Sequence, residues 1–389
     1  MKSMIPFLLV FLTIYGGMHL YLLVRLKGAF AMTAPVALLL AAVMVFFIFA
    51  PILVRVLEHG GYERAALAVA LAGYTWMGFL FITFSLSIAF DLLRWLSALA
   101  GMTPRFLTVY WSAILSLVLG FGLSAWGCYE ARNLQTTVLT IETEKLPPGI
   151  DRFRIVQLSD VHLGLVLREE RLKPMLRLVK EAEPDLLVST GDLVDGQMDM
   201  IAGSARLFQE IEPPWGKFAV KGNHEFYAGV RISDEFHEKA GFRLLRGEIA
   251  EILDGAILIA GVDDPAGRMV SPLDGPRAFR DTEEEEELFA SVSDRAFRIL
   301  LKHQPTASTA VPSPFDLQLS GHTHRGQIVP FNLVTALFYR YSSGFHRLPG
   351  GGHLYVSRGT GTWGPAIRLL SPPEVVVIDI VKVGYSDGM

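Results

Sequence analysis

The stretch Phe153-Arg154-Ile155-Val156-Gln157-Leu158-Ser159-Asp160-Val161-His162 decides the fold of the larger part of this chain. Its first six residues form an apolar run that is typical of a buried strand. Residues 169–182 then carry apolar side chains at helical spacing, and residues 186–189 predict a second strand. The order predicts a β-α-β unit. We expect further strands at residues 217–220, 256–260, 297–301, 317–320, 354–357 and 375–380.

The sequence before this region has a different character. Four stretches contain no Asp, Glu, Lys or Arg, and each is at least 22 residues long: residues 3–24, 28–54, 65–90 and 106–129. A helix of about 20 apolar residues crosses the hydrocarbon core of a bilayer. We therefore expect an N-terminal all-α transmembrane bundle of about four helices at 1–130, a linker and first strand at 131–150, and an α/β domain at 151–389.

A cleaved signal peptide is a weaker interpretation of the first apolar run. That run is longer than the apolar part of a signal peptide, has no clear A-x-A cleavage site and is followed by three more apolar runs. Within the four runs, His19 is the only residue that is Asp, Glu, Lys, Arg or His. This scarcity disfavours transport as the function.

Charge and composition narrow the possible partners. The chain is 51% hydrophobic and 19% charged, against roughly 25% charged in soluble proteins. Residues 1–130 hold seven basic and four acidic side chains, a net charge of +3, and the other 259 residues hold 28 and 35, a net charge of −7. We expect no nucleic-acid partner. The single cysteine, Cys128, excludes an intrachain disulfide.

Membrane orientation does not follow from the charges. With four spans, each side of the membrane collects four Lys or Arg residues near the ends of the helices. The excess of positive charge that marks the cytoplasmic side is therefore missing. We expect a multi-pass protein of the inner cell membrane, with the face that carries the α/β domain undecided.

Five short polar motifs follow predicted strands in chain order. They are Asp160-Val161-His162, Gly191-Asp192, Gly222-Asn223-His224-Glu225, His303, and Gly321-His322-Thr323-His324. Strand ends are where α/β folds assemble ligand sites. In extended backbone, the i, i+2 spacing of the two His-containing pairs would direct both side chains of a pair to one side.

The residue types indicate metal binding. Seven nitrogen and oxygen donors without cysteine are too many for one tetrahedral zinc ion, but they suit two ions of higher coordination. The pattern therefore predicts a dinuclear centre. Mn²⁺ is the preferred metal, with Fe or Zn as alternatives.

The order D-x-H, G-D, G-N-H-E, H and G-H-x-H resembles the calcineurin-like metallophosphoesterase superfamily over residues 155–380. The resemblance implies a sandwich of two mixed β-sheets flanked by helices. It implies that Asp192 bridges two metals, one held by Asp160, His162 and His324 and the other by Asn223, His303 and His322. Residues 158–164 and 356–374 are similar to the membrane-associated bacterial branch, which often has Gly where this chain has Arg325.

The resemblance also implies a function. We expect a membrane-anchored dimetal phosphohydrolase (phosphodiesterase, phosphomonoesterase or pyrophosphohydrolase) in which a metal-bridging hydroxide attacks phosphorus. His224 is the expected general acid, or else a residue that supports a ligand. Asp195 is expected to orient a ligand or a loop, and Glu225 to pair with an imidazole. Arg325, Arg358 and Arg368 are candidate phosphate contacts, each with a structural role as the alternative.

A bilayer anchor favours a substrate near lipid headgroups. The expected partners are therefore membrane lipids and either a phosphate ester or a lipid-linked pyrophosphate, such as a UDP-diacylglucosamine-type precursor. The alternative is a catalytically inactive membrane scaffold or sensor with the same fold. Inactive relatives usually lack a ligand or the proton donor, and this chain has all eight of these residues.

Overall fold

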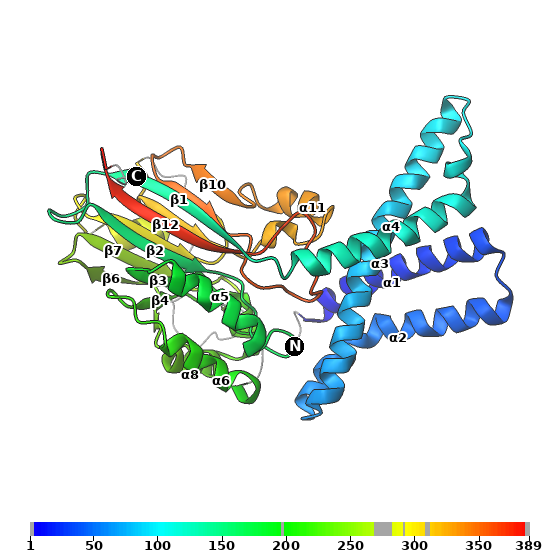
Figure 1. The fold of residues 1–389 in the computed structure, drawn as a ribbon, viewed down its shortest axis with the longest axis horizontal. Helices are drawn as coiled ribbons and strands as arrows, with labels where there is room; N and C mark the ends of the chain where they lie inside the picture. The colour runs from blue at the N-terminus through cyan, green and yellow to red at the C-terminus, as the bar shows by residue number, and fades with distance from the viewer. Residues whose placement is uncertain (1–3, 196–197, 268–281, 291, 308–311, 386–389) are drawn as a thin grey trace. The chain divides into compact units, whose positions relative to one another are not determined.

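The computed structural model describes residues 4–195, 198–267, 282–290, 292–307 and 312–385 (Figure 1). The chain divides into two compact units. The helical unit comprises Met1–Glu130 together with two short later segments, Ile328–Pro330 and Gly364–Leu369. The rest of the chain, Ala131–Gln327, Phe331–Trp363 and Leu370–Met389, forms the α/β unit.

The helical unit contains four long helices, as the charge-free runs predict. They are α1 (Met4–Phe30), α2 (Ala34–His59), α3 (Glu63–Leu99) and α4 (Val109–Glu130). All four are long and apolar enough to cross a membrane. The fold-class prediction for the N-terminal part is therefore confirmed.

The helices extend beyond the apolar runs and bring charged residues together. Asp91 lies inside α3, where it forms an ion pair with Arg25 of α1 and accepts a hydrogen bond from Tyr21. Arg25 also donates to Ser112 Oγ of α4 over 2.8 Å. This cluster is not among the features predicted from the sequence. Because each charge has a partner, the cluster links three helices at a tolerable desolvation cost.

Small residues allow close helix packing. A Cβ atom on Gly120 of α4 would lie 2.2 Å from Thr83 Oγ1 of α3, so an alanine already collides there. The later segments of this unit pack in the same way. Ile367 and Ile328 cluster with Ile82 of α3, and a Cβ on Gly127 would lie 2.5 Å from the Ile367 side chain.

The α/β unit is built on two six-stranded sheets. The first has the order β1-β12-β2-β3-β4-β5 and the second β10-β11-β9-β8-β7-β6. The first sheet comprises β1 (Gln135–Thr143), β2 (Arg152–Leu158), β3 (Leu186–Ser189), β4 (Lys217–Ala219), β5 (Arg243–Leu244) and β12 (Glu374–Lys382). The second comprises β6 (Glu248–Ile252), β7 (Ile257–Val262), β8 (Phe297–Lys302), β9 (Leu317–Ser320), β10 (Gly344–Arg347) and β11 (His353–Val356).

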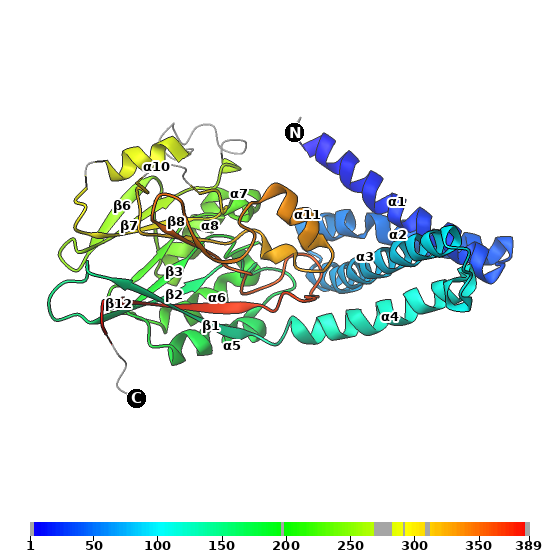
Figure 2. The same ribbon diagram turned by 90° about the horizontal axis from the view of Figure 1, so that it is seen from above.

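The sheets pack face to face around the main core. Buried side chains of both sheets, such as Ile155 of β2 and Ile299 of β8, form one cluster between them. Helices α5 (Glu169–Glu181), α6 (Met198–Gln209) and α8 (Val230–Ala240) cover the outer face of the first sheet (Figures 1 and 2). The predicted sandwich of two mixed sheets with flanking helices is confirmed.

Strand direction places the polar motifs. In the first sheet β2, β3 and β4 run parallel, and in the second β7, β8 and β9 run parallel. The carboxyl ends of parallel neighbours meet at one edge of a sheet. The loops after these strands are therefore brought together.

The close packing of α3 against α4 can be tested with Gly120→Leu. The added side chain cannot enter the space beside Thr83, so we expect the protein in detergent to lose about 1–3 kcal/mol of stability, seen as a lower thermal midpoint. Gly122→Leu is the matched control on the same helix, because nothing lies within 4 Å of a Cβ at Gly122. Equal midpoints for the two variants would contradict this packing.

Candidate metal centre

The predicted donors come from loops that follow five strands. Asp160 lies two residues after β2, Asp192 three after β3, and His322 two after β9. His303 follows β8 directly, and Asn223 begins the short helix α7 (Asn223–Ala228). The structure therefore brings together residues that are up to 164 positions apart in the sequence.

Three overlapping groups of donor atoms lie together. Within each group the donor atoms are all within 4.8 Å of one another: Asp160, His162 and His324; His162, Asp192 and His224; Asp192, His303 and His322. Asp192 belongs to two of the groups, one with His162 and His224 and the other with His303 and His322. This arrangement suits two adjacent cations with a shared carboxylate.

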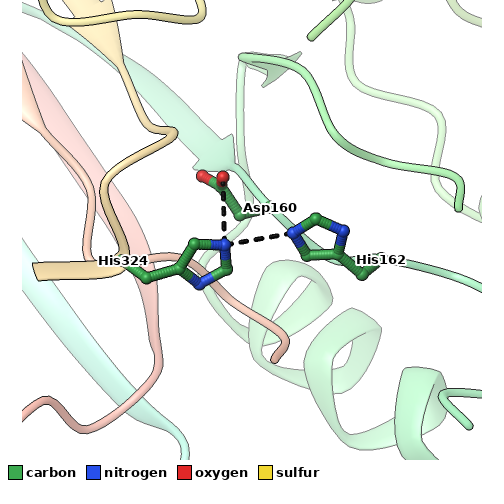
Figure 3. Close-up of side chains that lie close together, drawn as sticks. All are labelled: Asp160, His162 and His324. Atoms are coloured by element: carbon green, nitrogen blue, oxygen red, sulfur yellow. Dashed lines mark hydrogen bonds and ion pairs between the residues drawn. The ribbon is translucent and has the colours of Figure 1, made fainter. Parts of the chain in front are cut away.

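The first group converges through its ring nitrogens (Figure 3). His162 Nε2 and His324 Nε2 are 3.0 Å apart, and His324 Nε2 is 3.4 Å from Asp160 Oδ1. His162 Nε2 is also 3.9 Å from Asp192 Oδ2. The facing atoms are metal-ligand atoms of imidazole and carboxylate, so the residues present fit a cation between them.

In the second group, a hydrogen bond to a residue outside the group orients the His303 ring. His303 Nδ1 donates to the carbonyl oxygen of Thr190 over 2.8 Å. His303 Nε2 lies 3.2 Å from Asp192 Oδ2 and 3.1 Å from His322 Nδ1. Although burial opposes this, the carboxylate of Asp192 raises the pKa of His303 well above its usual value. In the neutral form that binds a metal, the lone pair of the ring is on Nε2. Such outer partners orient metal-binding imidazoles.

Asn223 is the seventh predicted ligand. Its Oδ1 is buried and has no hydrogen-bond partner among the described residues. A buried carbonyl oxygen without a partner is costly, and a cation would satisfy it. The structure thus brings six of the seven predicted ligand residues into groups that could hold a metal ion, and Asn223 remains a candidate through this oxygen.

The backbone of these loops corrects one expectation. Asp160 and His162, like His322 and His324, are not in extended strands but have φ between +48° and +70°. This left-handed region costs roughly 1–3 kcal/mol for a non-glycine residue. Tertiary hydrogen bonds hold it: the His322 amide donates to both oxygens of Asp160, each over 3.0 Å.

Two glycines are required by the close approach of the loops. A Cβ on Gly222 would lie 2.2 Å from Asp192 Oδ1, and a Cβ on Gly321 would lie 2.2 Å from Asp160 Oδ2. Any side chain at either position would displace a carboxylate of the centre.

Glu225 holds the Asp192 loop. The expected pairing of this carboxylate with an imidazole is wrong, because its oxygens accept hydrogen bonds from backbone amides at 2.6–3.0 Å: those of Asp192, Leu193, Val194 and Gly222. Glu225 is fully buried. Burial raises its pKa to about 7, since these amide bonds only partly offset the cost of the buried charge.

His224 is held beside the two groups. Its Nδ1 lies 2.8 Å from Asp195 Oδ1, and its backbone amide donates to Asp192 Oδ1 over 2.9 Å. Burial by itself lowers the pKa of His224, but the carboxylates of Asp192 and Asp195 outweigh it and raise the pKa to about 9. Asp195 therefore contacts His224, the expected general acid, whereas the sequence led us to expect that it orients a ligand or a loop.

Two of the ligand candidates have a lowered pKa because they are buried. Burial lowers the pKa of His162 to about 4 and that of His322 to about 3. Both rings are therefore neutral at physiological pH, the form in which imidazole binds a metal.

The three candidate arginines occupy different environments. Arg325 directly follows His324 and is exposed. Arg358 instead donates to Glu374 Oε2 over 2.6 Å and to Thr137 over 3.2 Å, and Arg368 is fully buried in the segment Gly364–Leu369 of the helical unit. The structure thus favours the structural alternative for Arg358 and Arg368 and leaves Arg325 as the candidate phosphate contact.

Two neighbours of the centre were not predicted. The Tyr339 hydroxyl lies 2.8 Å from His322 Nε2, and Asp264 accepts a hydrogen bond from Gln304, the residue after His303, over 2.8 Å. Asp264 lies two residues after β7 and could have been found by the strand-end pattern. No local sequence signal marks Tyr339, because it comes from a helix end 17 residues after its partner.

Known proteins resemble this chain in sequence. Residues 153–326 match the family described as "Calcineurin-like phosphoesterase". An "Uncharacterized metallophosphoesterase" of Aquifex aeolicus is 44% identical over 67% of this chain and 97% of its own length. YkuE of Bacillus subtilis, also described as an uncharacterized metallophosphoesterase, is 34% identical over 67% and 90%. A Danio rerio "Transmembrane protein with metallophosphoesterase domain" is 30% identical over 68% and 62%.

The hydrogen bonds of Glu225 can be tested with Glu225→Gln. The amide nitrogen of Gln would face backbone N–H donors, so we expect a loss of about 2 kcal/mol or more and reduced metal content. Thermal unfolding and elemental analysis of the purified full chain would measure both effects. Glu235→Gln, which removes only an exposed pairing with Arg231, is the control, and a Glu225 variant that behaves like this control would contradict the assigned role.

Proposed function

Because this chain belongs to the calcineurin-like metallophosphoesterase family, we propose that it is a membrane-anchored dimetal phosphohydrolase. The observation that carries the proposal is the position of Asp192, whose carboxylate is shared by two groups of imidazole donors. A phosphodiester, phosphomonoester or pyrophosphate bond is the proposed target.

The proposed metal ligands follow from the donor geometry. One ion would be held by Asp160, His162 and His324, the other by Asn223, His303 and His322, with Asp192 between them. Two bound cations would neutralise the phosphoryl oxygens and lower the pKa of water. The donor set of imidazole, carboxylate and amide oxygen suits Mn²⁺, with Fe or Zn as alternatives.

His224 is the proposed general acid. Its Nδ1 is engaged by Asp195, so its Nε2 is the atom that would give a proton to the leaving oxygen. Asp195 would keep the imidazole in that orientation throughout the reaction. Arg325 is the proposed contact for a phosphate oxygen, because a guanidinium matches phosphate geometry.

An inactive membrane scaffold or sensor is the alternative function. Keeping so many buried nitrogen and oxygen donors close together costs free energy, and this disfavours the alternative. An inactive protein has no need for left-handed backbone at Asp160, His162, Asp192, His322 and His324. The inner cell membrane is the proposed location, since four helices in the described part of the chain could span a membrane.

Removal of the shared carboxylate tests the dimetal assignment. Asp192→Asn should lower the metal content of the detergent-purified protein and reduce Mn²⁺-dependent hydrolysis of bis(4-nitrophenyl) phosphate by about 10³-fold or more, the scale of losing a key catalytic group. Asp185→Asn, which changes a carboxylate at the opposite end of β3, is the control. Unchanged turnover by Asp192→Asn would refute the proposal.

The acid role of His224 predicts a dependence on the leaving group. His224→Ala should bind metal normally and slow the hydrolysis of esters with poor leaving groups by about 10²–10⁴-fold, the range of general acid catalysis. Esters with good leaving groups, which need no proton, should be affected least. An equal loss across a series of substituted phenyl phosphodiesters would exclude His224 as the acid.

The substrate class can be determined with one panel of candidate substrates. Purified protein with Mn²⁺ would be assayed on lipid-linked pyrophosphates of the UDP-diacylglucosamine type, on cyclic nucleotides and on simple aryl phosphates. A preference for the lipid-linked compounds is expected. Activity confined to the water-soluble esters would remove the lipid proposal and leave the phosphohydrolase assignment intact.

A further inference from the structure

Helix α11 (Phe331–Phe338) exposes an unusual apolar surface. Its sequence FNLVTALF contains no charged residue, and the side chain buried within it is that of Thr335. Leu337 is 83% exposed, Phe338 78% and Leu333 66%. Single exposed apolar residues are ordinary, but a whole helix of them marks an interaction site.

The charge of the surrounding sequence favours an anionic partner. Residues 317–373 contain five arginines and no Asp or Glu, although residues 131–389 as a whole carry a net charge of −7. Arg358 of this stretch is neutralised by Glu374. Arg325 and Arg340, which flank α11 in the sequence, are both exposed. An apolar helix with flanking cations is typical of an element that binds an anionic lipid surface.

α11 follows a segment of the helical unit directly in the chain. Ile328–Pro330 belongs to the helical unit, where Ile328 packs with Ile82 of α3. α11 begins at Phe331, the next residue along the chain. Because one peptide bond joins α11 to a unit whose helices are apolar enough to span a membrane, a lipid bilayer is an apolar phase that α11 could reach.

The same helix is linked to the metal centre. Tyr339, directly after α11, contacts His322 through its hydroxyl group. Exposed aromatic rings also contact His224: the ring centroids of Trp363 and Tyr227 lie 5.8 and 5.6 Å from that of His224. Exposed aromatic side chains therefore lie beside a histidine next to the predicted ligands.

We propose that α11 lies in the headgroup region of the bilayer, with Leu333, Leu337 and Phe338 among the acyl chains and Arg340 at the lipid phosphates. The substrate that this placement selects is an amphiphilic phosphoester that remains in the membrane while its phosphate reaches the metal centre. The substrate part of this proposal rests on the proposed function. The placement of α11 does not, and it is tested without activity.

The placement is tested with a fluorescent label on the full chain in lipid nanodiscs. In a Cys128→Ser background, Leu337→Cys carries an environment-sensitive NBD fluorophore, and the nanodiscs contain phosphatidylcholine, phosphatidylglycerol and doxyl-labelled lipid. Arg231→Cys on α8, whose native side chain is 83% exposed, is the matched control. We expect blue-shifted emission and quenching by doxyl lipid at position 337 and neither at position 231.

Two outcomes would overturn the placement. One is an aqueous emission at position 337 that equals that at position 231. The other is a label that is shielded from water but not quenched by lipid, and whose shielding depends on protein concentration. That result would mean that a second copy of the chain covers α11.

The substrate class is tested with Leu337→Ser/Phe338→Ser. These side chains are exposed, so the fold should tolerate the change. Hydrolysis of a diacyl phosphodiester in nanodiscs should fall about tenfold or more through lost apolar contact, while hydrolysis of bis(4-nitrophenyl) phosphate should change less than about twofold. Val138→Ser on β1, 62% exposed in the native protein, should affect neither substrate.

Loss of both activities to the same extent, or of neither, would refute the substrate assignment. The results would differ if the proposed phosphohydrolase function itself were wrong. In that case the native protein would hydrolyse neither ester with Mn²⁺, while the fluorescence measurement would still decide where α11 lies.

Discussion

The α/β unit depends on one electrostatic constraint: nitrogen and oxygen donors from separate loops face one another in a buried space. His162 Nε2 and His324 Nε2 are 3.0 Å apart, and His303 Nε2 is 3.2 Å from Asp192 Oδ2. Lone pairs and a carboxylate at such distances repel one another unless protons or cations lie between them. The two sheets and their connections must supply the free energy that holds this arrangement.

The backbone of the loops holds the donors in this arrangement. Five of the seven donor residues, all except Asn223 and His303, adopt left-handed conformations that ordinary residues avoid, and hydrogen bonds between loops keep them there. Glu225 binds four backbone amides around Asp192, and Gly222 leaves room for the Asp192 carboxylate. A rigid support of this kind places catalytic groups more accurately than flexible side chains do.

The membrane part and the chemistry are connected through the sequence. Ile328–Pro330 and Gly364–Leu369 lie far along the chain from the four helices, yet they belong to the helical unit. The first of these segments follows the His322–His324 motif closely and leads directly into the apolar helix α11. The same stretch of chain thus contributes candidate ligands to the metal centre and packing contacts to the helical unit. In our proposal it also binds a lipid surface.

The sequence by itself determined the features that depend on local pattern. Runs without charge predict four helices because a bilayer excludes unpaired charge, and polar residues after buried strands predict the donors from Asp160 to His324 because parallel strands end at one edge. Only the tertiary structure decided what depends on distant partners. The left-handed loops, the amide contacts of Glu225, the pairing of Arg358 with Glu374 and the contact of Tyr339 with His322 arise from the packing of separate loops, and no periodicity records such packing.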